Sequence, residues 1–178
     1  MKFIQIKDAF EIYDGPHATP KKTDSGPIYL GIDAISDTGA ISYKSLAHLS
    51  EEDFKTWTRR VTPKEGDLVF SYEATLGKYA LIPADFRCCL GRRLALIRSK
   101  NNLISTEWLF YYFRTPQWDR FIKNHIVHGS TVDRISVDEF ANYPIPCYSK
   151  DSQNRMISVL KGLDSKMRIN SLINDNLV

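Results

Sequence analysis

The chain has 178 residues, is 43% hydrophobic and 12% aromatic, and carries a formal net charge of +3. These values suit one globular domain with a real core and an appended helix, and they do not fit a disordered chain. No stretch approaches the roughly 18 apolar residues of a membrane span, and the N-terminus lacks a signal-peptide core, so we expect a cytoplasmic protein.

Positive charge is concentrated in the middle of the chain. Residues 54–134 contain 14 lysines and arginines and 7 acids, a net of +7, whereas residues 1–53 have a net of −4. A polyanion would therefore be expected to bind the middle of the chain. A solvated surface of mixed charge is the alternative interpretation.

The N-terminal part predicts short elements around a long loop. Residues 3–12 fit a short helix or a strand with a turn, and residues 28–35 alternate as a strand that residues 40–43 pair with or extend. Between them, residues 13–27 contain three prolines and two glycines and predict a loop. Its Lys21 and Lys22 can donate to phosphate oxygens, although an ordinary surface loop explains them as well.

The central part predicts a sheet. The segment from Ser50 to Asp53 is typical of a capped helix start, and the helix that follows should bury Phe54 and Trp57. Strands are predicted over residues 67–72, 77–82 and 88–98, with a bulge at Gly91 in the third. We therefore expect a twisted, mainly antiparallel sheet.

Two short aromatic helices should cover this sheet. They are predicted over residues 106–113 and 116–124, and their aromatic residues have the spacing of a core. An aromatic platform for unstacked bases is the less favoured alternative. After these helices, Ser130, Thr131 and Arg134 supply the donors that a phosphate contact needs.

The last stretch, residues 149–178, predicts one long helix, with Asp151 or Ser152 as its N-cap. Apolar residues recur at steps of three and four, and polar Asn170 continues the same seam, which favours a coiled-coil strand over an ordinary core helix. The predicted fold class is α+β, with a recognition domain over residues 1–148 and a packing helix over residues 149–178. The predicted seam consists of Met156, Leu160, Leu163, Met167, Asn170, Ile173 and Leu177.

Catalytic and metal-binding patterns are not found in the sequence. The phosphate-loop, dinucleotide, zinc-protease and serine-hydrolase motifs are all missing. Asp67, Glu73 and Lys78 resemble a nuclease pattern only at the wrong spacing. The three cysteines form no C-x-x-C pair, which argues against a zinc site or a disulfide framework, and we interpret them as small buried apolar residues. These features indicate a non-catalytic binding domain joined to a coiled-coil helix.

Four stretches spread over nearly the whole chain carry a family resemblance. The first three are residues 14–21 (DGPHATPK), 70–78 (FSYEATLGK) and 129–135 (GSTVDRI). The fourth begins with residues 143–146 (YPIP) and continues in the helix with Gln153, Leu160, Leu163, Asp164, Lys166, Asn170, Ile173 and Asn174. In this order they resemble one half of the specificity subunit of a type I DNA restriction–modification enzyme. The approach to the helix, residues 146–153 (PCYSKDSQ), departs from the family's apolar-Pro-Pro run.

The resemblance implies a fold, a role and partners. A complete subunit has two target-recognition domains, each followed by a long helix, and the paired helices set the distance between the two halves of a split DNA target. The subunit is not an enzyme and binds no cofactor. Modification subunits that bind S-adenosylmethionine and restriction subunits that use ATP and magnesium assemble with it. One domain and one helix imply half of a longer subunit or a half-subunit that pairs with a second copy; the seam reaching Leu177 favours the first.

We hypothesise that the basic middle sheet and its loops enter the DNA major groove. Glu73 could accept from a cytosine amino group, and Arg92 or Arg93 could bind guanine. A protein-interaction module with incidental DNA affinity and a metal-dependent nuclease are the alternative functions. The predicted DNA-binding residues are Lys21, Lys22, Ser71, Tyr72, Glu73, Thr75, Lys78, Arg92, Arg93, Ser130, Thr131 and Arg134.

Overall fold

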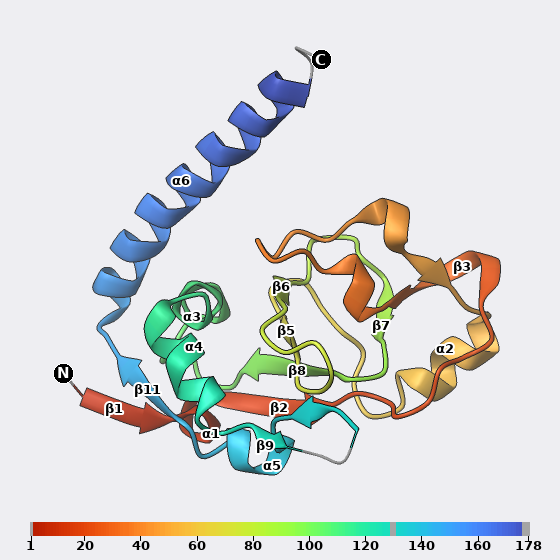
Figure 1. Ribbon diagram of the computed structural model, residues 1–178, viewed down its shortest axis with the longest axis horizontal. Helices are drawn as coiled ribbons and strands as arrows, with labels where there is room; N and C mark the ends of the chain where they lie inside the picture. The colour runs from red at the N-terminus through yellow and green to blue at the C-terminus, as the bar shows by residue number, and fades with distance from the viewer. Residues whose placement is uncertain (1, 129–130, 176–178) are drawn as a thin grey trace.

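The computed structural model describes residues 2–128 and 131–175, and it confirms an α+β fold with antiparallel sheets, short helices and one long C-terminal helix (Figure 1). The long helix α6 (Lys150–Asp175) starts at one end of the molecule, whereas α2 (Glu51–Trp57), β3 (Thr23–Leu30) and β7 (Cys88–Leu90) form the opposite end. Within the described residues, none of the helices combines the length and the apolar character that a membrane span requires.

The N-terminal segment is a strand, a helical turn and a second strand. β1 (Lys2–Gln5) leads through α1 (Ile6–Ala9) into β2 (Phe10–Asp14), which joins the main sheet. β1 pairs antiparallel with β11 (Pro144–Cys147), the strand that directly precedes α6. The start of the chain and the base of the long helix are therefore held together.

The central strands divide into two sheets. The four-stranded antiparallel sheet has the order β2-β8-β5-β6 and contains β5 (Leu68–Ser71), β6 (Tyr79–Leu81) and β8 (Leu94–Ser99). The three-stranded sheet has the order β4-β3-β7, with β4 (Ala47–His48) antiparallel to β3 and β7 parallel to it. The β3–β7 pair is thus a parallel exception to the antiparallel pattern.

The single strand predicted over residues 88–98 is wrong, because the chain changes sheets in its middle. Gly91 donates its backbone N–H to the carbonyl of Leu30 over 2.8 Å, and a Cβ on Gly91 would lie only 2.5 Å from that oxygen. Arg93 then takes a left-handed conformation, with φ of 76°. This tight turn places β7 in one sheet and β8 in the other. The predicted bulge would instead have left both segments in a single strand of one sheet.

The strand expected over residues 28–35 lies earlier in the chain. β3 ends at Leu30, and the 3-10 helix η1 (Ile32–Ala34) follows. A second 3-10 helix, η2 (Tyr43–Ser45), precedes β4, and residues 40–43 contribute only the isolated bridge between Ile35 and Ile41. The extended backbone of β3 is satisfied on both sides, by β4 and by β7.

Hydroxyl caps start the short helices, and the cap at Ser50 confirms the helix start predicted there. Ser50 accepts from the Asp53 N–H at the start of α2, and Ser105 and Thr115 cap the next two helices in the same way. The remaining short elements are α3 (Thr106–Phe113), α4 (Pro116–Lys123), β9 (Val127–His128), β10 (Asp133–Arg134) and α5 (Val137–Phe140).

An aromatic core joins these helices to the four-stranded sheet. The rings of Phe113 and Trp118 stack with centroids 4.3 Å apart, and Phe140 stacks on Phe70 of β5 at the same distance. Trp118 is fully buried and donates its indole N–H to the Tyr79 hydroxyl over 3.1 Å. The aromatic residues of α3 and α4 are therefore mainly core, as their spacing predicts.

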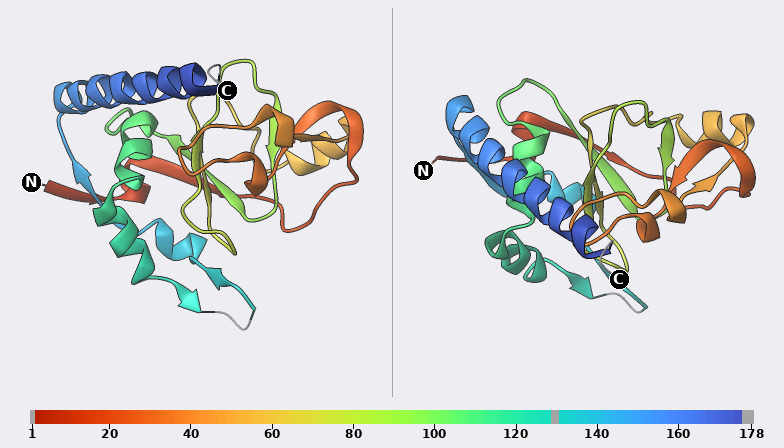
Figure 2. Two further views of the ribbon diagram at one scale, coloured as in Figure 1. Left: turned by 45° about the horizontal axis from the view of Figure 1, so that its top comes forward. Right: turned by 90° about the horizontal axis from the view of Figure 1, so that it is seen from above.

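The long helix lies across α3, as both views of Figure 2 show. The N-cap is Ser149 and not the expected Asp151 or Ser152, because the Ser149 hydroxyl accepts from the Ser152 N–H. Ile157 is buried against the core. Ion pairs from Lys161 to Glu107 and from Arg114 to Asp164 continue the contact. From Ser165 to Asn174 the side chains are exposed, so the domain covers little of this part of α6.

The predicted seam of α6 is mostly exposed. Met156 is half-buried, Leu160, Leu163, Met167 and Ile173 are 36–59% exposed, and Asn170 is also exposed. Leu177 lies outside the described residues. The domain therefore covers little of this apolar stripe.

Candidate nucleic-acid interface

Three segments that are far apart in the sequence meet on one surface. Tyr72 donates its backbone N–H to the Arg93 carbonyl over 3.1 Å, and its own carbonyl accepts from Ile135 over 2.7 Å. One residue pair further on, Ala74 donates to the Asp133 carbonyl over 2.9 Å. These backbone hydrogen bonds join residues 72–75, 92–93 and 131–134 into what we call the three-loop surface.

An ion pair lies at the centre of the three-loop surface. Arg93 donates through Nε to Glu73 Oε1 over 3.0 Å, and the two side chains are 31% and 27% exposed. Glu73 also forms an isolated backbone bridge with Arg134. A guanidinium and a carboxylate are thus presented side by side, and these are the groups that read guanine and cytosine in the major groove.

Ser71 and Tyr72 support this surface from below. Ser71 is 1% exposed, and its hydroxyl accepts from the Lys78 N–H over 3.0 Å, which closes the β5–β6 hairpin. Tyr72 is 5% exposed, and its hydroxyl lies 3.5 Å from His17 Nδ1. Burial, followed by the nearby Asp14 carboxylate, raises the pKa of Tyr72 well above its usual range. These two side chains hold the loop in place and offer little area to a ligand.

The other predicted DNA-binding side chains differ in whether another side chain already engages them. Lys78 pairs with Asp37 over 2.5 Å, whereas Thr75, Thr131 and Arg134 are exposed. Arg92 is exposed as well, and its backbone N–H donates to the Tyr29 hydroxyl. In the described part of the chain, neither Arg92 nor Arg134 takes part in an ion pair, so both are available to phosphates.

Two further predicted contacts lie apart from these. Lys21 and Lys22 are exposed in the segment between β2 and β3, and no hydrogen bond among residues 2–128 and 131–175 connects their side chains to the three-loop surface. Ser130 lies outside the described residues. The structure therefore leaves Lys21 and Lys22 separate and brings together these predicted residues: Tyr72, Glu73, Thr75, Arg92, Arg93, Thr131 and Arg134.

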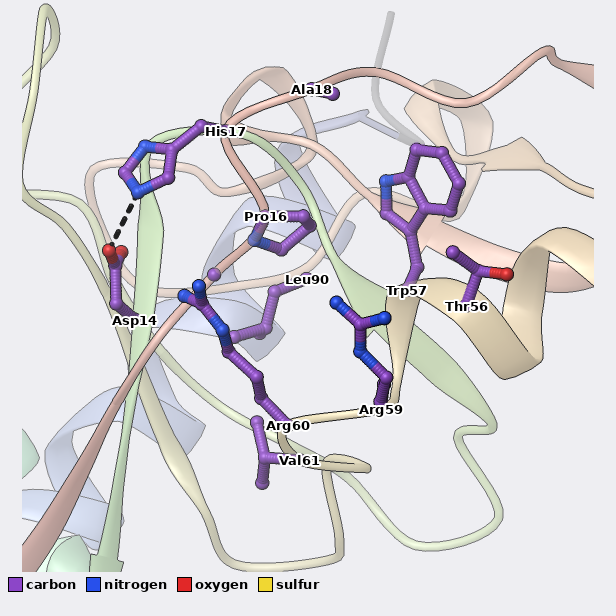
Figure 3. A pocket seen from close by; sticks show the side chains of 11 residues that line it. Asp14, Pro16, His17, Ala18, Thr56, Trp57, Arg59, Arg60, Val61 and Leu90 are labelled. Atoms are coloured by element: carbon purple, nitrogen blue, oxygen red, sulfur yellow. Dashed lines mark ion pairs between the residues drawn. The ribbon is translucent and has the colours of Figure 1, made fainter.

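A pocket of about 380 Å³ beside this surface was not predicted from the sequence. It is bounded by Pro16 and His17 on one side and by Trp57, Arg59 and Arg60 at the end of α2 on the other (Figure 3). His17 Nε2 lies 2.9 Å from Asp14 Oδ2. The Arg59-Arg60 pair is the one signal in the sequence that could have pointed to it, but its partners lie about 40 residues earlier.

The cysteines do not form a reactive or metal-binding centre in the described residues. Cys88 and Cys89 are fully buried, and burial raises the pKa of the Cys89 thiol to about 12 and that of Cys88 further. No group of three or more His, Cys, Asp and Glu side chains in the described ranges is placed to hold a metal ion.

Comparison with known protein families shows which family the chain belongs to. The model of the type I restriction modification DNA specificity domain matches residues 1–177. The chain belongs to this family. A relative of this specificity domain is a putative type I restriction enzyme specificity subunit, S.HindORF215P, from Haemophilus influenzae strain Rd. It is 22% identical over 123 residues, which are 68% of this chain and 30% of the relative.

Solved structures share the fold of this specificity domain. The S subunit of a type I restriction–modification system from M. genitalium matches with a TM-score of 0.67 and 15% identity over 98% of this chain and 42% of that one. A chain from a study of complex assembly and conformational transition of the type I R-M system has a TM-score of 0.68, with 18% identity over 94% and 39%. The HsdS subunit from Thermoanaerobacter tengcongensis has a TM-score of 0.61, with 18% identity over 94% and 38%. The specificity domain thus spans less than half the length of these relatives.

Proposed function

We propose that this specificity domain is a non-catalytic module that reads one half of a bipartite DNA target and directs modification and restriction subunits to it. The observation that carries the proposal is the three-loop surface, which gathers Glu73, Arg93 and Arg134 from three separate segments. Because backbone hydrogen bonds already fix these segments, little conformational entropy is lost when their side chains contact base edges.

The groups on this surface suit two kinds of contact. The half-buried Glu73–Arg93 pair offers one acceptor and one fork of donors to base edges, with the geometry held by the turn at Arg93. Arg92 and Arg134 are exposed and suit phosphates, which position the domain without carrying sequence information. The excess of positive charge in residues 54–134 supports binding to a polyanion.

The long helix supplies the second half of the proposal. Its exposed seam fits a second long helix, either from the other half of a longer subunit or from a second copy. The modification subunits that we propose as partners would carry the S-adenosylmethionine, and the restriction subunits would use the ATP and magnesium. This division of labour would leave the specificity domain itself without a catalytic step.

Fluorescence anisotropy at low salt tests the proposal. A labelled duplex pool with random sequence should bind, and selection from the pool should enrich one half-site. Each phosphate contact should add about 0.9 to the slope of log affinity against log salt. The Arg134→Gln variant should lower this slope, whereas Arg120→Gln, an equal change at an exposed position of α4, should not. A slope near zero would contradict DNA reading.

The alternatives make different predictions in the same assay. A protein-interaction module would bind no duplex at low salt even with a modification subunit present. A nuclease would cleave the duplex when magnesium is added to the chain alone.

A further inference from the structure

We propose that the pocket between the loop after β2 and the end of α2 binds a nucleotide, that is, one base with one phosphate. This site goes beyond the DNA-reading surface, because nothing in that proposal uses Trp57, Arg59 or Arg60. A volume of about 380 Å³ is at the lower end of the range for small-ligand pockets. A free nucleotide and a nucleotide within a DNA strand offer the same base and phosphate, so either one could occupy the pocket.

Two cations supply the anion-binding part of the pocket. Arg59 and Arg60 are exposed, and among the described residues no ion pair involves either of them. Figure 3 shows the Arg59 guanidinium below the space between Pro16 and Trp57, and the Arg60 guanidinium on the other side of Pro16, towards Asp14. Guanidinium groups that are not neutralised by a carboxylate are the preferred bidentate partners of phosphate oxygens.

The tryptophan supplies both a flat surface and an unused donor. The Trp57 Nε1 atom is buried from solvent and has no hydrogen-bond partner in the described structure, and Figure 3 shows it on the edge of the ring that faces Pro16. A buried N–H group without an acceptor is rare in folded proteins and calls for an explanation. An acceptor on a bound base or phosphate would satisfy it once the ring turns enough to expose the N–H to the pocket.

The remaining lining fits a base rather than a bare anion. Pro16, Val61 and Leu90 give the pocket apolar walls, which a phosphate ion alone would not use. Asp14 also lines the pocket, but its carboxylate faces the Tyr72 hydroxyl and is engaged with His17 through Oδ2.

Indole NMR signals allow the site to be tested directly. The chain has three tryptophans, so a ¹H–¹⁵N spectrum should contain three indole signals, and the one lost in a Trp57→Phe variant belongs to Trp57. The Trp118 N–H already donates to the Tyr79 hydroxyl. Deoxyadenosine monophosphate added to the full chain should shift this signal saturably. Deoxyadenosine and inorganic phosphate should each bind at least tenfold more weakly, because each fills only one part of the pocket.

A pair of matched double variants separates the site from general charge attraction. Arg59→Gln with Arg60→Gln should weaken binding at least tenfold. Lys44→Gln with Arg120→Gln removes the same charge from exposed positions that do not line the pocket, and it should leave binding unchanged. An unmoved Trp57 signal, equal losses in the two variants, or phosphate binding as tightly as the nucleotide would each overturn the proposal.

A competition experiment then identifies the source of the nucleotide. If a duplex with one unpaired adenosine displaces the mononucleotide better than the matched perfect duplex does, the pocket takes a nucleotide from a DNA strand. If both duplexes act equally, the pocket takes a free nucleotide. Both results support the site, and since the first titration contains no duplex, its failure would leave the DNA-reading proposal intact.

Discussion

At the residue scale, the Glu73–Arg93 pair carries the sharpest prediction about DNA reading. Arg93→Ala should cost about 1–3 kcal/mol at one base position and relax the sequence preference there, because a half-buried guanidinium with a fixed backbone makes a directional contact. Anisotropy with a panel of single-base variants of the selected half-site measures this. Arg120→Ala is the control, since Arg120 is exposed on α4. An equal loss on every sequence would instead make Arg93 a phosphate contact.

The buried cysteines make a second prediction at this scale. Because burial raises the pKa of Cys89 to about 12, its thiol stays neutral in the folded protein while an unfolded thiol ionises near pH 8.5. The unfolded state therefore loses protons first, and the free energy of unfolding should fall as the pH rises from about 8.5 towards 12. A Cys88→Ala, Cys89→Ala variant should show a shallower fall in denaturant titrations. A thiol reagent at pH 8 should label only Cys147 in the folded chain, so rapid labelling of all three thiols would contradict the burial argument.

The residues of the candidate site show what a sequence can and cannot predict. Tyr72, Arg93 and Arg134 each belong to a stretch that could be named in advance, because the resemblance covers two of these stretches and the arginine-rich strand stands out by itself. Their meeting depends on backbone hydrogen bonds across 21 to 63 positions, such as that from Tyr72 to Arg93, and no local pattern encodes those. The pocket was missed for the same reason, since Pro16 and Arg60 are neighbours only in space.

At the element scale, Gln153 fixes the base of α6. Its side chain is fully buried, accepts from the Ser105 N–H, and donates to the carbonyls of Leu103 and Tyr148, each over 2.9 Å. Gln153→Ala should lower the free energy of unfolding by about 2–4 kcal/mol, because it leaves these buried backbone groups without partners. Denaturant unfolding measures the change. Gln117→Ala, at an exposed position of α4, should change stability by less than about 0.5 kcal/mol, and equal losses in the two variants would refute the anchoring role.

Elements whose ends are set locally were predicted well, and those set by distant contacts were not. The bounds of α3 and α4 agree with the predicted helices to within one residue, because Ser105, Thr115 and Pro116 mark the starts in the sequence itself. The break between β7 and β8 depends on the close approach of Gly91 to Leu30, which lies 61 residues earlier in β3. A sequence pattern cannot show that approach.

At the scale of the whole molecule, the exposed seam of α6 predicts association. Light scattering should show a mass that rises with concentration towards a dimer, because side chains such as Leu163 and Met167 are more than half exposed and the domain does not cover them. Leu163→Glu with Met167→Glu should give a monomer. Ser158→Glu with Ser165→Glu, on the opposite side of the helix at 100° per residue, should still associate. A wild-type chain that stays monomeric at high concentration would contradict self-association and leave a different helix as the partner.

The pairing of β1 with β11 has a consequence for how the protein is made. Phe3 pairs with Pro146, so β1 leaves the ribosome 143 residues before its partner does. Contacts between such distant positions slow folding, and until residues 144–147 emerge β1 remains an unpaired edge that other chains can join. During synthesis the central sheets can therefore form before the β1–β11 pair. This pair, which holds the base of α6, forms only after residues 144–147 have been made.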